Sequence, residues 1–491
     1  MALHLSKSKF CSAVQCPKIL WLKANMPDEF DDSVMNETVL KRGLEVGDLA
    51  MGLFGPFVEV PYGNLGDMLS KTKELLDEDT HIIAEASFSK NNCFCSVDIL
   101  INNGNNKVEL YEVKSSTEVK DIYLYDVAYQ YYVLTEMGFE VEKAGLVYID
   151  NTYVRHGDVD MQELFAIADV TTEVKNLQPE VRSYIEELRR YMDQTDEPSQ
   201  AIGLHCFKPY ECGFWKYCTR NLPQPNVFDV ASLRKNQKIG LLNQGIISFE
   251  DIEENDAVAE KYMIQVQHEL HDMPEDINET EIRMFMKDLY YPMYFLDFET
   301  FQPAVPMYDE SRPYEQITFQ YSLHYVLEEG GEVMHKEFLA YPGEDPRRAV
   351  AEHLCEDIPK DVCVIAYNMG FEKGRIATMA ELYPSMREHL MNIHDHIQDL
   401  MIPFQKKHYY NKAMQGSYSI KYVLPALFPG DPELDYHNLE EVHNGGEASA
   451  TFMAMHNMTL EELKSSRKNL LKYCELDTYA MVKIWQKLKQ I

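Results

Sequence analysis

In residues 294–301 the chain reads Tyr-Phe-Leu-Asp-Phe-Glu-Thr-Phe. Its apolar side chains predict a short buried strand, and its two acids, Asp297 and Glu299, stand two positions apart. Because residues i and i+2 of a strand point to the same face, we expect both carboxylates to project into one spot beside an apolar core. Two desolvated acids repel each other unless a cation separates them, and a divalent metal ion is the common solution. The alternative is a polar strand end with two solvated acids.

Two later stretches carry acids in related patterns. Residues 362–368 predict another buried strand, and Asn-Met-Gly-Phe-Glu at 368–372 brings Glu372 to an expected helix start. Near the C-terminus, Tyr473 and Asp477 lie four positions apart in a helical pattern, so they share one face of that helix.

These three motifs together resemble the DEDDy exonucleases of the ribonuclease-H-like superfamily. The resemblance implies 3′-to-5′ exonuclease activity with two metal ions, Mg²⁺ or Mn²⁺, held by Asp297, Glu299, Glu372 and Asp477. It also implies that Tyr473 positions the attacking water. The family usually has Asp where this chain has Glu372, whose carboxylate extends one methylene farther from the backbone.

The length and composition of the chain limit the classes of protein to which it can belong. A chain of 491 residues predicts two or three domains, and 45% hydrophobic residues with 31 Tyr and 22 Phe provide packed cores rather than wholesale disorder. No apolar run approaches the ~20 residues needed to cross a bilayer, and no signal-peptide core is present, so we expect a cytoplasmic protein without membrane contact. Ten Cys in such a chain favour metal ligands or free thiols over disulfides.

The net charge of −34 is unusual for a nucleic-acid enzyme, because phosphate binding normally uses Lys and Arg. It does not exclude one, since local basic clusters can make these contacts. The charge predicts weak non-specific affinity and dependence on a protein partner or on a preferred end structure. Nucleic acid is the expected partner, with DNA favoured and RNA left open, and the sequence does not indicate an oligomeric state.

Three successive strands are expected in the first 120 residues, at 82–88, 94–101 and 108–113. Asp98 lies on the second strand, and Glu112 and Lys114 lie on one face of the third. A helix expected at 123–137 carries Gln130 near its centre.

An acid on one strand and Glu-x-Lys on its hairpin partner resemble the PD-(D/E)xK nucleases, and the spacing and helices are similar to RecB-type members. The resemblance implies a restriction-endonuclease-like fold in which Asp98 and Glu112 bind Mg²⁺ or Mn²⁺ and Lys114 holds or deprotonates the nucleophile. It adds Gln130 and Glu45 as site residues, Glu45 standing where the family often has His or an acid. An ordinary hairpin with a surface lysine is the alternative.

Three cysteines follow this segment with five residues between successive members, and one precedes it: Cys206, Cys212, Cys218 and Cys16. This pattern resembles the iron–sulfur RecB-like nucleases, which include CRISPR-associated members, and implies a [4Fe–4S] cluster on four thiolates. Zinc suits four thiolates as well, and free buried thiols are a further alternative. Cys11 competes with Cys16 as the early ligand.

The predicted class is therefore α/β and multidomain. A restriction-endonuclease-like domain at 1–220 is followed by a helical connector at 221–289, which resembles a helix-hairpin-helix element, and by a ribonuclease-H-like domain at 290–491. The combination resembles bacterial fusions of these two nuclease modules and implies a two-site nuclease acting on DNA in repair, recombination or defence. One alternative keeps a single live exonuclease site with the N-terminal fold as a nucleic-acid clamp. The other is a non-catalytic scaffold of two inactive nuclease folds.

Overall fold

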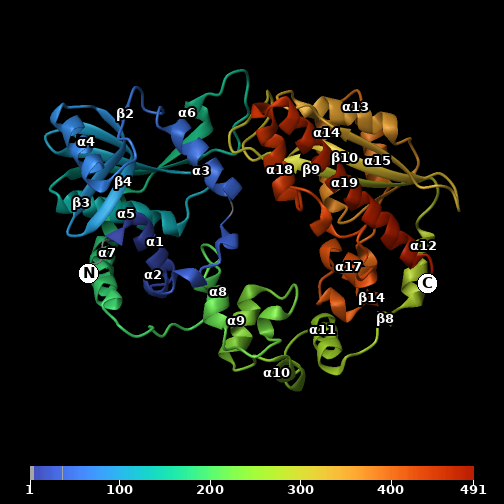
Figure 1. The fold of residues 1–491 in the computed structure, drawn as a ribbon. Coiled ribbons are helices and arrows are strands. Elements are labelled where there is room, and N and C mark those ends of the chain that lie inside the picture. Colours follow the sequence, from blue (N-terminus) through green and yellow to red (C-terminus); the bar gives the residue numbers. More distant parts are fainter. Residues whose placement is uncertain (1–4, 36) are drawn as a thin grey trace. The chain divides into compact units, whose positions relative to one another are not determined.

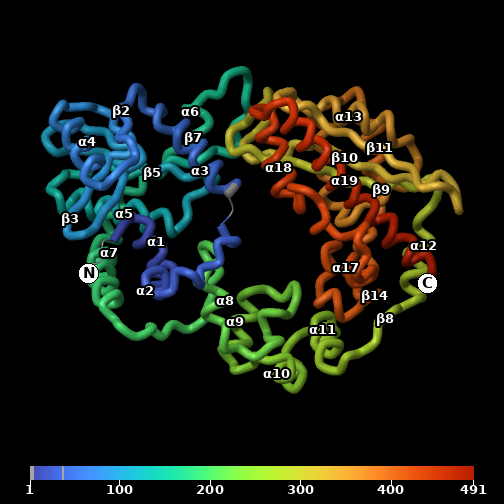
Figure 2. Tube along the Cα trace, viewed as in Figure 1, coloured from blue at the N-terminus to red at the C-terminus, as the bar shows by residue number. Residues whose placement is uncertain are grey.

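The computed structural model describes residues 5–35 and 37–491 of the chain (Figure 1). The fold divides into two compact units: the first contains residues 1–221 and 303–315, and the second contains residues 222–302 and 316–491. Each unit combines a mixed β-sheet with helices, so the predicted α/β, multidomain class is confirmed. In Figure 2 the second unit begins in green, before α9 (Lys235–Asn243), and ends in red at α19 (Leu460–Leu488).

Seven strands form the sheet of the first unit, in the order β2–β3–β4–β5–β6–β7 with β1 paired to β4. Their bounds are β1 (Leu5–Ser6), β2 (Val58–Glu59), β3 (Ile82–Lys90), β4 (Cys93–Gly104), β5 (Lys107–Lys114), β6 (Glu140–Ile149) and β7 (Phe165–Asp169). The hairpins β3–β4 and β4–β5 are antiparallel, and their turns place consecutive Asn residues at φ between 52 and 60°, which asparagine tolerates. The three predicted strands are confirmed.

The helices of the first unit cover this sheet and lead away from it. They are α1 (Lys7–Gln15), α2 (Lys18–Asn25), α3 (Glu37–Ala50), α4 (Leu65–Asp77), α5 (Asp121–Glu136), α6 (Met161–Leu164), α7 (Thr171–Met192) and α8 (Trp215–Thr219), with 3-10 turns at Pro27–Glu29, Asp32–Val34 and Leu204–Cys206. The hydroxyl of Ser6 caps α1 by accepting from the backbone N–H of Lys9. α5 is buried along most of its length because it lies between the sheet and α7 (Figure 1).

Five strands form the main sheet of the second unit, in the order β11–β10–β9–β12–β13. Their bounds are β9 (Met293–Phe301), β10 (Ile317–Val326), β11 (Met334–Leu339), β12 (Cys363–Ala366) and β13 (Ile397–Asp399). The first three form an antiparallel meander, whereas β12 and β13 run parallel to β9. A second small sheet pairs β8 (Asp276–Ile277) with β14 (Tyr409–Tyr410).

The remaining helices of the second unit pack on both faces of the main sheet or lie in the segment before it. They are α10 (Phe249–Glu254), α11 (Glu260–His271), α12 (Glu279–Lys287), α13 (Pro346–Asp357), α14 (Gly370–Leu382), α15 (Arg387–Asp395), α16 (Ile402–Gln405), α17 (Ile420–Leu427) and α18 (Gly445–Ala454), with 3-10 turns at Val227–Asp229, Lys412–Met414, Tyr436–Asn438 and Met455–Asn457. The segment predicted as a connector thus contains helices, as expected, and is grouped with the second unit from residue 222 onward.

Successive side chains of β9 point to opposite faces of the sheet and so pack into two different hydrophobic cores. Tyr294, Leu296 and Phe298 pack on one side of the sheet with residues of α13 to α15. Met293 and Phe295 pack on the other side, against α19. Among the described residues, no helix combines the length and the apolar character that crossing a membrane requires.

Candidate metal centres

The acid pair of β9 continues the face that α19 covers. Asp297 and Glu299 lie two and four positions after Phe295, so all three side chains point to the same face of β9. The ring of Phe295 lies 5.7 Å from that of Trp485 on α19, measured between centroids. On α19, Trp485 stands eight positions after Asp477, two steps of four, so the two side chains follow one stripe of the helix. The geometry of a strand and a helix therefore brings acids far apart in sequence to one place.

One carboxylate oxygen from each of Asp297, Glu299 and Asp477 lies within 4.8 Å of the other two. Burial raises the pKa values of Asp297 and Glu299 well above their usual range, and repulsion from Asp477 adds to both shifts. Burial also raises the pKa of Asp477, to about 6. Without a cation this group of acids is electrostatically unfavourable, which is the condition that a bound divalent ion relieves.

Glu372 lies at the start of α14 and is 2% exposed. Its Oε2 is buried and has no hydrogen-bond partner among the described residues. Burial raises its pKa to about 8, and its charge contributes to the raised pKa of Asp297. Glu372 therefore adjoins the three acids with an uncommitted oxygen, although it is not among the three whose oxygens approach within 4.8 Å.

Two tyrosines contact Asp477. The predicted Tyr473 hydrogen-bonds to its carboxylate, which acts against the burial that raises its pKa. Tyr436, which the sequence did not reveal, donates its hydroxyl to Oδ1 of Asp477 at 2.6 Å. The charge of Lys421 on α17 also lowers the pKa values of Asp477 and Glu299.

A hollow open to solvent adjoins this site. It has an empty volume of about 1260 Å³, and its lining includes Lys421, Tyr436, His437, His443 and Asn444. Tyr436 and Lys421, which both act on Asp477, line the hollow, whereas the clustered acids themselves do not. It is large enough for a nucleotide-sized group.

The predicted residues of the first unit also lie together. Lys114 Nζ lies 2.6 Å from Oε1 of Glu112 and 2.5 Å from Oδ2 of Asp126. The amide of Gln130 donates to Oε2 of Glu112 at 2.7 Å. Asp98 accepts from the backbone N–H of Val113 at 2.7 Å, which fixes it beside the same strand.

Lys7 enters this cluster from the first residue of α1. Its Nζ lies 2.8 Å from Glu112, 3.6 Å from Asp98 and 3.8 Å from Asp126. Burial alone would raise the pKa of Glu112, but Lys114 and Lys7 outweigh it and hold that pKa below its usual range. Burial raises the pKa of Asp98 to about 7.

Lys7 and Asp126 were not predicted as site residues. Asp126 stands four positions before Gln130 on α5, so helical spacing was the signal that could have found it. The predicted site residue Glu45 lies on α3. The charged side chain that acts on the pKa of Glu45 is Arg42. Glu85 on β3, by contrast, is subject to the charges of the cluster, because Lys7 and Glu112 both act on its pKa.

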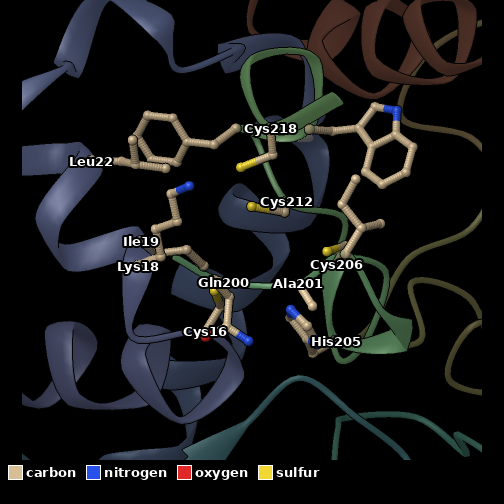
Figure 3. A pocket seen from close by; sticks show the side chains of 13 residues that line it. Cys16, Lys18, Ile19, Leu22, Gln200, Ala201, His205, Cys206, Cys212 and Cys218 are labelled. Carbon is tan, nitrogen blue, oxygen red and sulfur yellow. The ribbon is translucent and has the colours of Figure 1, made fainter. Parts of the chain in front are cut away.

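The four predicted cysteines line one cavity with a volume of about 20 Å³ (Figure 3). Apolar side chains such as Ile19, Leu22 and Phe214 form much of the remaining lining, with His205 and Lys18. Burial raises the pKa of Cys16 to about 11. Cys11 does not line this cavity, and its thiol lies near Asp126 and Lys114 of the carboxylate cluster instead.

The cysteine sulfurs are more widely spaced than the acid oxygens. Among the described residues, the cysteines do not provide three sulfur atoms that all lie within 4.8 Å of one another. Tetrahedral zinc with bonds of ~2.3 Å needs sulfur atoms only ~3.8 Å apart. The cavity thus presents four thiols, with the imidazole of His205 beside them.

Comparison with known proteins finds relatives without an assigned activity. A family model described as a domain of unknown function (DUF2779) matches residues 294–419, which include the acids of β9 and Glu372 but not α19. An uncharacterized protein of Ureaplasma parvum is 25% identical over 235 residues, which are 44% of this chain and 34% of that protein. An uncharacterized protein of Mycoplasma genitalium is 25% identical over 209 residues, 39% of this chain and 31% of that protein. The match therefore spans about a third of these relatives. No solved structure matches the chain.

Proposed function

We propose that this protein is a metal-dependent nuclease whose principal site is the acid cluster of the second unit. The observation that carries the proposal is the convergence of Asp297, Glu299 and Asp477 within 4.8 Å, from a central strand and a helix about 180 residues apart in sequence. A mixed sheet with the acid pair on its middle strand also supports the ribonuclease-H-like resemblance.

The donor set suits Mg²⁺ or Mn²⁺. All three clustered ligands are carboxylates, which hard divalent cations prefer, and Glu372 adds a buried oxygen that lacks a partner among the described residues. When bound, two such ions activate water and stabilise the charge that develops during phosphodiester hydrolysis.

The chain's own residues have defined tasks in this reaction. Asp297, Glu299, Glu372 and Asp477 supply the negative charge that retains the ions. Tyr473, on the helical face of Asp477, orients the water whose oxygen forms the new bond to phosphorus, while the bond to the leaving 3′-oxygen breaks and that oxygen takes a proton. Lys421 and the hollow beside Tyr436 bind the phosphate and the terminal nucleotide of the substrate. We infer DNA as the substrate and 3′-to-5′ as the polarity.

The cysteine cavity suits a [4Fe–4S] cluster. One of its four thiols, that of Cys16, precedes strands β2 to β7 of the first unit in sequence, and the other three follow those strands. The wide spacing of the sulfur atoms favours a cluster over a single zinc ion. Bound there, the cluster would tie Cys16, between α1 and α2, to the segment around α8.

The test is a cleavage assay on single- and double-stranded DNA and RNA with a 3′ label, in Mg²⁺ or Mn²⁺ and in chelator. We expect the wild type to shorten DNA from the 3′ end only with metal. Asp297→Asn and Asp477→Asn should each lose at least 100-fold in rate, because each removes one charged ligand. Asp288→Asn, an exposed acid after α12, is the matched control and should cleave like the wild type. Equal cleavage by all four proteins would refute the proposal.

The first unit supports a second candidate, in which it binds nucleic acid without cutting it. Lys7 and Lys114 already neutralise Glu112 and Asp126, so a metal ion there would compete with two ammonium groups. Asp98→Ala with Glu112→Ala distinguishes the candidates: the two-site nuclease loses part of its cleavage, whereas the clamp retains all of it.

A further inference from the structure

Two histidines and an acid form another group of metal-ligand atoms in the second unit. His324 on β10 and His335 on β11 are direct partners in the antiparallel register, with ring centroids 4.5 Å apart. Glu475 lies on α19, and one ligand atom from each of the three lies within 4.8 Å of the other two. Glu475 and Asp477 are two positions apart on the helix and do not share a face, so this group is distinct from the acid cluster.

A chain of hydroxyl groups determines which ring nitrogens carry protons. Thr478 Oγ1 lies 3.1 Å from the carbonyl oxygen of Glu475, which only accepts, so Thr478 donates its proton there. His324 Nδ1, at 2.7 Å from the same Oγ1, must then be the donor. Ser322 likewise donates to Thr478 at 2.7 Å, and it therefore accepts from Nε2 of His335 at 2.9 Å.

With the protons placed in this way, Nε2 of His324 and Nδ1 of His335 each keep a free lone pair. The latter lies 4.0 Å from Oε1 of Glu475. The neutral imidazole ring, with one unprotonated nitrogen, is the form that binds metal. A metal-binding histidine usually donates its other ring N–H to an oxygen acceptor, and here the hydroxyl oxygens of Thr478 and Ser322 are those acceptors.

We propose that His324, His335 and Glu475 bind a zinc ion through Nε2, Nδ1 and a carboxylate oxygen. Two imidazoles and one carboxylate are a known zinc donor set, and imidazole favours zinc over Mg²⁺. Glu337 stands two positions after His335 on β11, and the charges of His335 and Glu475 act on it, so it can complete a fourth position in place of water. The ion fastens α19, which carries Asp477, to the β10–β11 hairpin.

The test measures zinc content rather than cleavage, so its outcome is independent of the nuclease proposal. The full chain is equilibrated with zinc in excess Mg²⁺, which occupies carboxylate sites, passed through gel filtration and analysed by mass spectrometry of the metal. We expect the wild type to hold about one more equivalent of zinc than His335→Ala. His335 is only half-buried on an edge strand, so this variant should fold, and circular dichroism without zinc checks that it does. His456→Ala, an exposed histidine elsewhere in the same unit, should match the wild type.

Zinc-edge X-ray absorption identifies the ligands of that additional equivalent. We expect the difference between wild type and His335→Ala to contain nitrogen and oxygen at ~2.0–2.2 Å and no sulfur at ~2.3 Å. Glu475→Gln is a second variant at an exposed position, and it should weaken zinc binding by about 10-fold or more. Equal zinc in the wild type and both variants, or a difference made only of sulfur ligands, would overturn the proposal.

Discussion

At the scale of single residues, Asp477 has three kinds of neighbour that set its charge. Burial raises its pKa to about 6, while hydrogen bonds from Tyr436 and Tyr473 and the charge of Lys421 act in the opposite direction. A carboxylate with this pKa is largely ionised near neutral pH, and ionisation is what metal binding requires. Tyr436 is therefore a positioning residue for the proposed metal site.

Tyr436→Phe should weaken Mn²⁺ binding by about 10-fold, because the lost hydrogen bond no longer favours the charged form of Asp477. The pH at which binding reaches half its maximum should rise in the variant. Isothermal titration with Mn²⁺ across pH 5.5–8.5 measures both effects. An unchanged pH profile with weaker binding would assign Tyr436 a packing role instead.

The metal-free acid cluster should make the second unit less stable as pH rises. The pKa values of Glu372, about 8, and Asp477, about 6, exceed those of the unfolded chain, so the folded state keeps protons that the unfolded state has released. Stability is then greatest below about pH 4 for these groups and is lost as pH rises to about 8. Glu372→Gln should remove a part of this loss on the order of a few kcal/mol.

Urea unfolding at several pH values, in chelator and in saturating Mn²⁺, checks this dependence. Mn²⁺ should restore the stability at high pH in the wild type. A metal-free protein whose stability is flat between pH 5 and pH 8 would contradict the raised pKa values.

Some site residues had sequence signals and others had none. Strand and helix periodicities placed Asp297 with Glu299, and Tyr473 with Asp477, on shared faces. The resemblance to the DEDDy exonucleases then implied that the two pairs belong to one site. Tyr436 lies in an irregular turn 41 positions before Asp477, and only the tertiary fold connects the two.

At the scale of elements, the strands were the more predictable part. β3, β4, β5 and β9 each alternate or bury apolar residues, so their ranges followed from the sequence pattern. The start of α1 is marked by the serine cap at Ser6. The sequence pattern could not predict the contacts of Lys7. This residue follows the cap, and its ammonium group lies among the carboxylates of β4, β5 and α5.

Lys7→Met should destabilise the first unit by about 3 kcal/mol, because it leaves buried carboxylates with one cation in place of two. Added Mg²⁺ should recover part of that loss if the vacated position accepts a divalent ion. Thermal unfolding with and without Mg²⁺ measures both quantities, and Lys73→Met on the exposed face of α4 serves as the control. Equal stability of the two variants would show that Lys7 is dispensable to the cluster.

At the scale of the whole molecule, the two units contain two differently compensated acid clusters. In the first unit lysines provide the positive charge. In the second unit Lys421 acts on Glu299 and Asp477, and Arg375 acts on Glu372. The class of fold was predictable from the sequence, as were the clustered acids of the second unit. In the first cluster, Lys7 and Asp126 were not predicted. The segment 303–315 was not, since its assignment to the first unit interrupts the second and depends on long-range contacts.

The cysteine cavity gives a prediction that concerns the whole first unit. Protein purified without oxygen should contain about four irons and be brown, and Cys212→Ser should lose both the iron and the thermal stability of that unit. Cys355→Ser in the second unit is the matched control and should keep the iron. Stoichiometric zinc in place of iron would contradict the cluster.

The central claim is that the acids of β9 and α19 bind divalent ions. Anomalous diffraction from crystals of the full chain grown in millimolar Mn²⁺ tests it most directly. We predict a manganese peak bound by Asp297, Glu299 and Asp477, absent in Asp297→Asn crystals. A wild-type map without manganese at these carboxylates, in crystals where the three side chains are ordered, would contradict it.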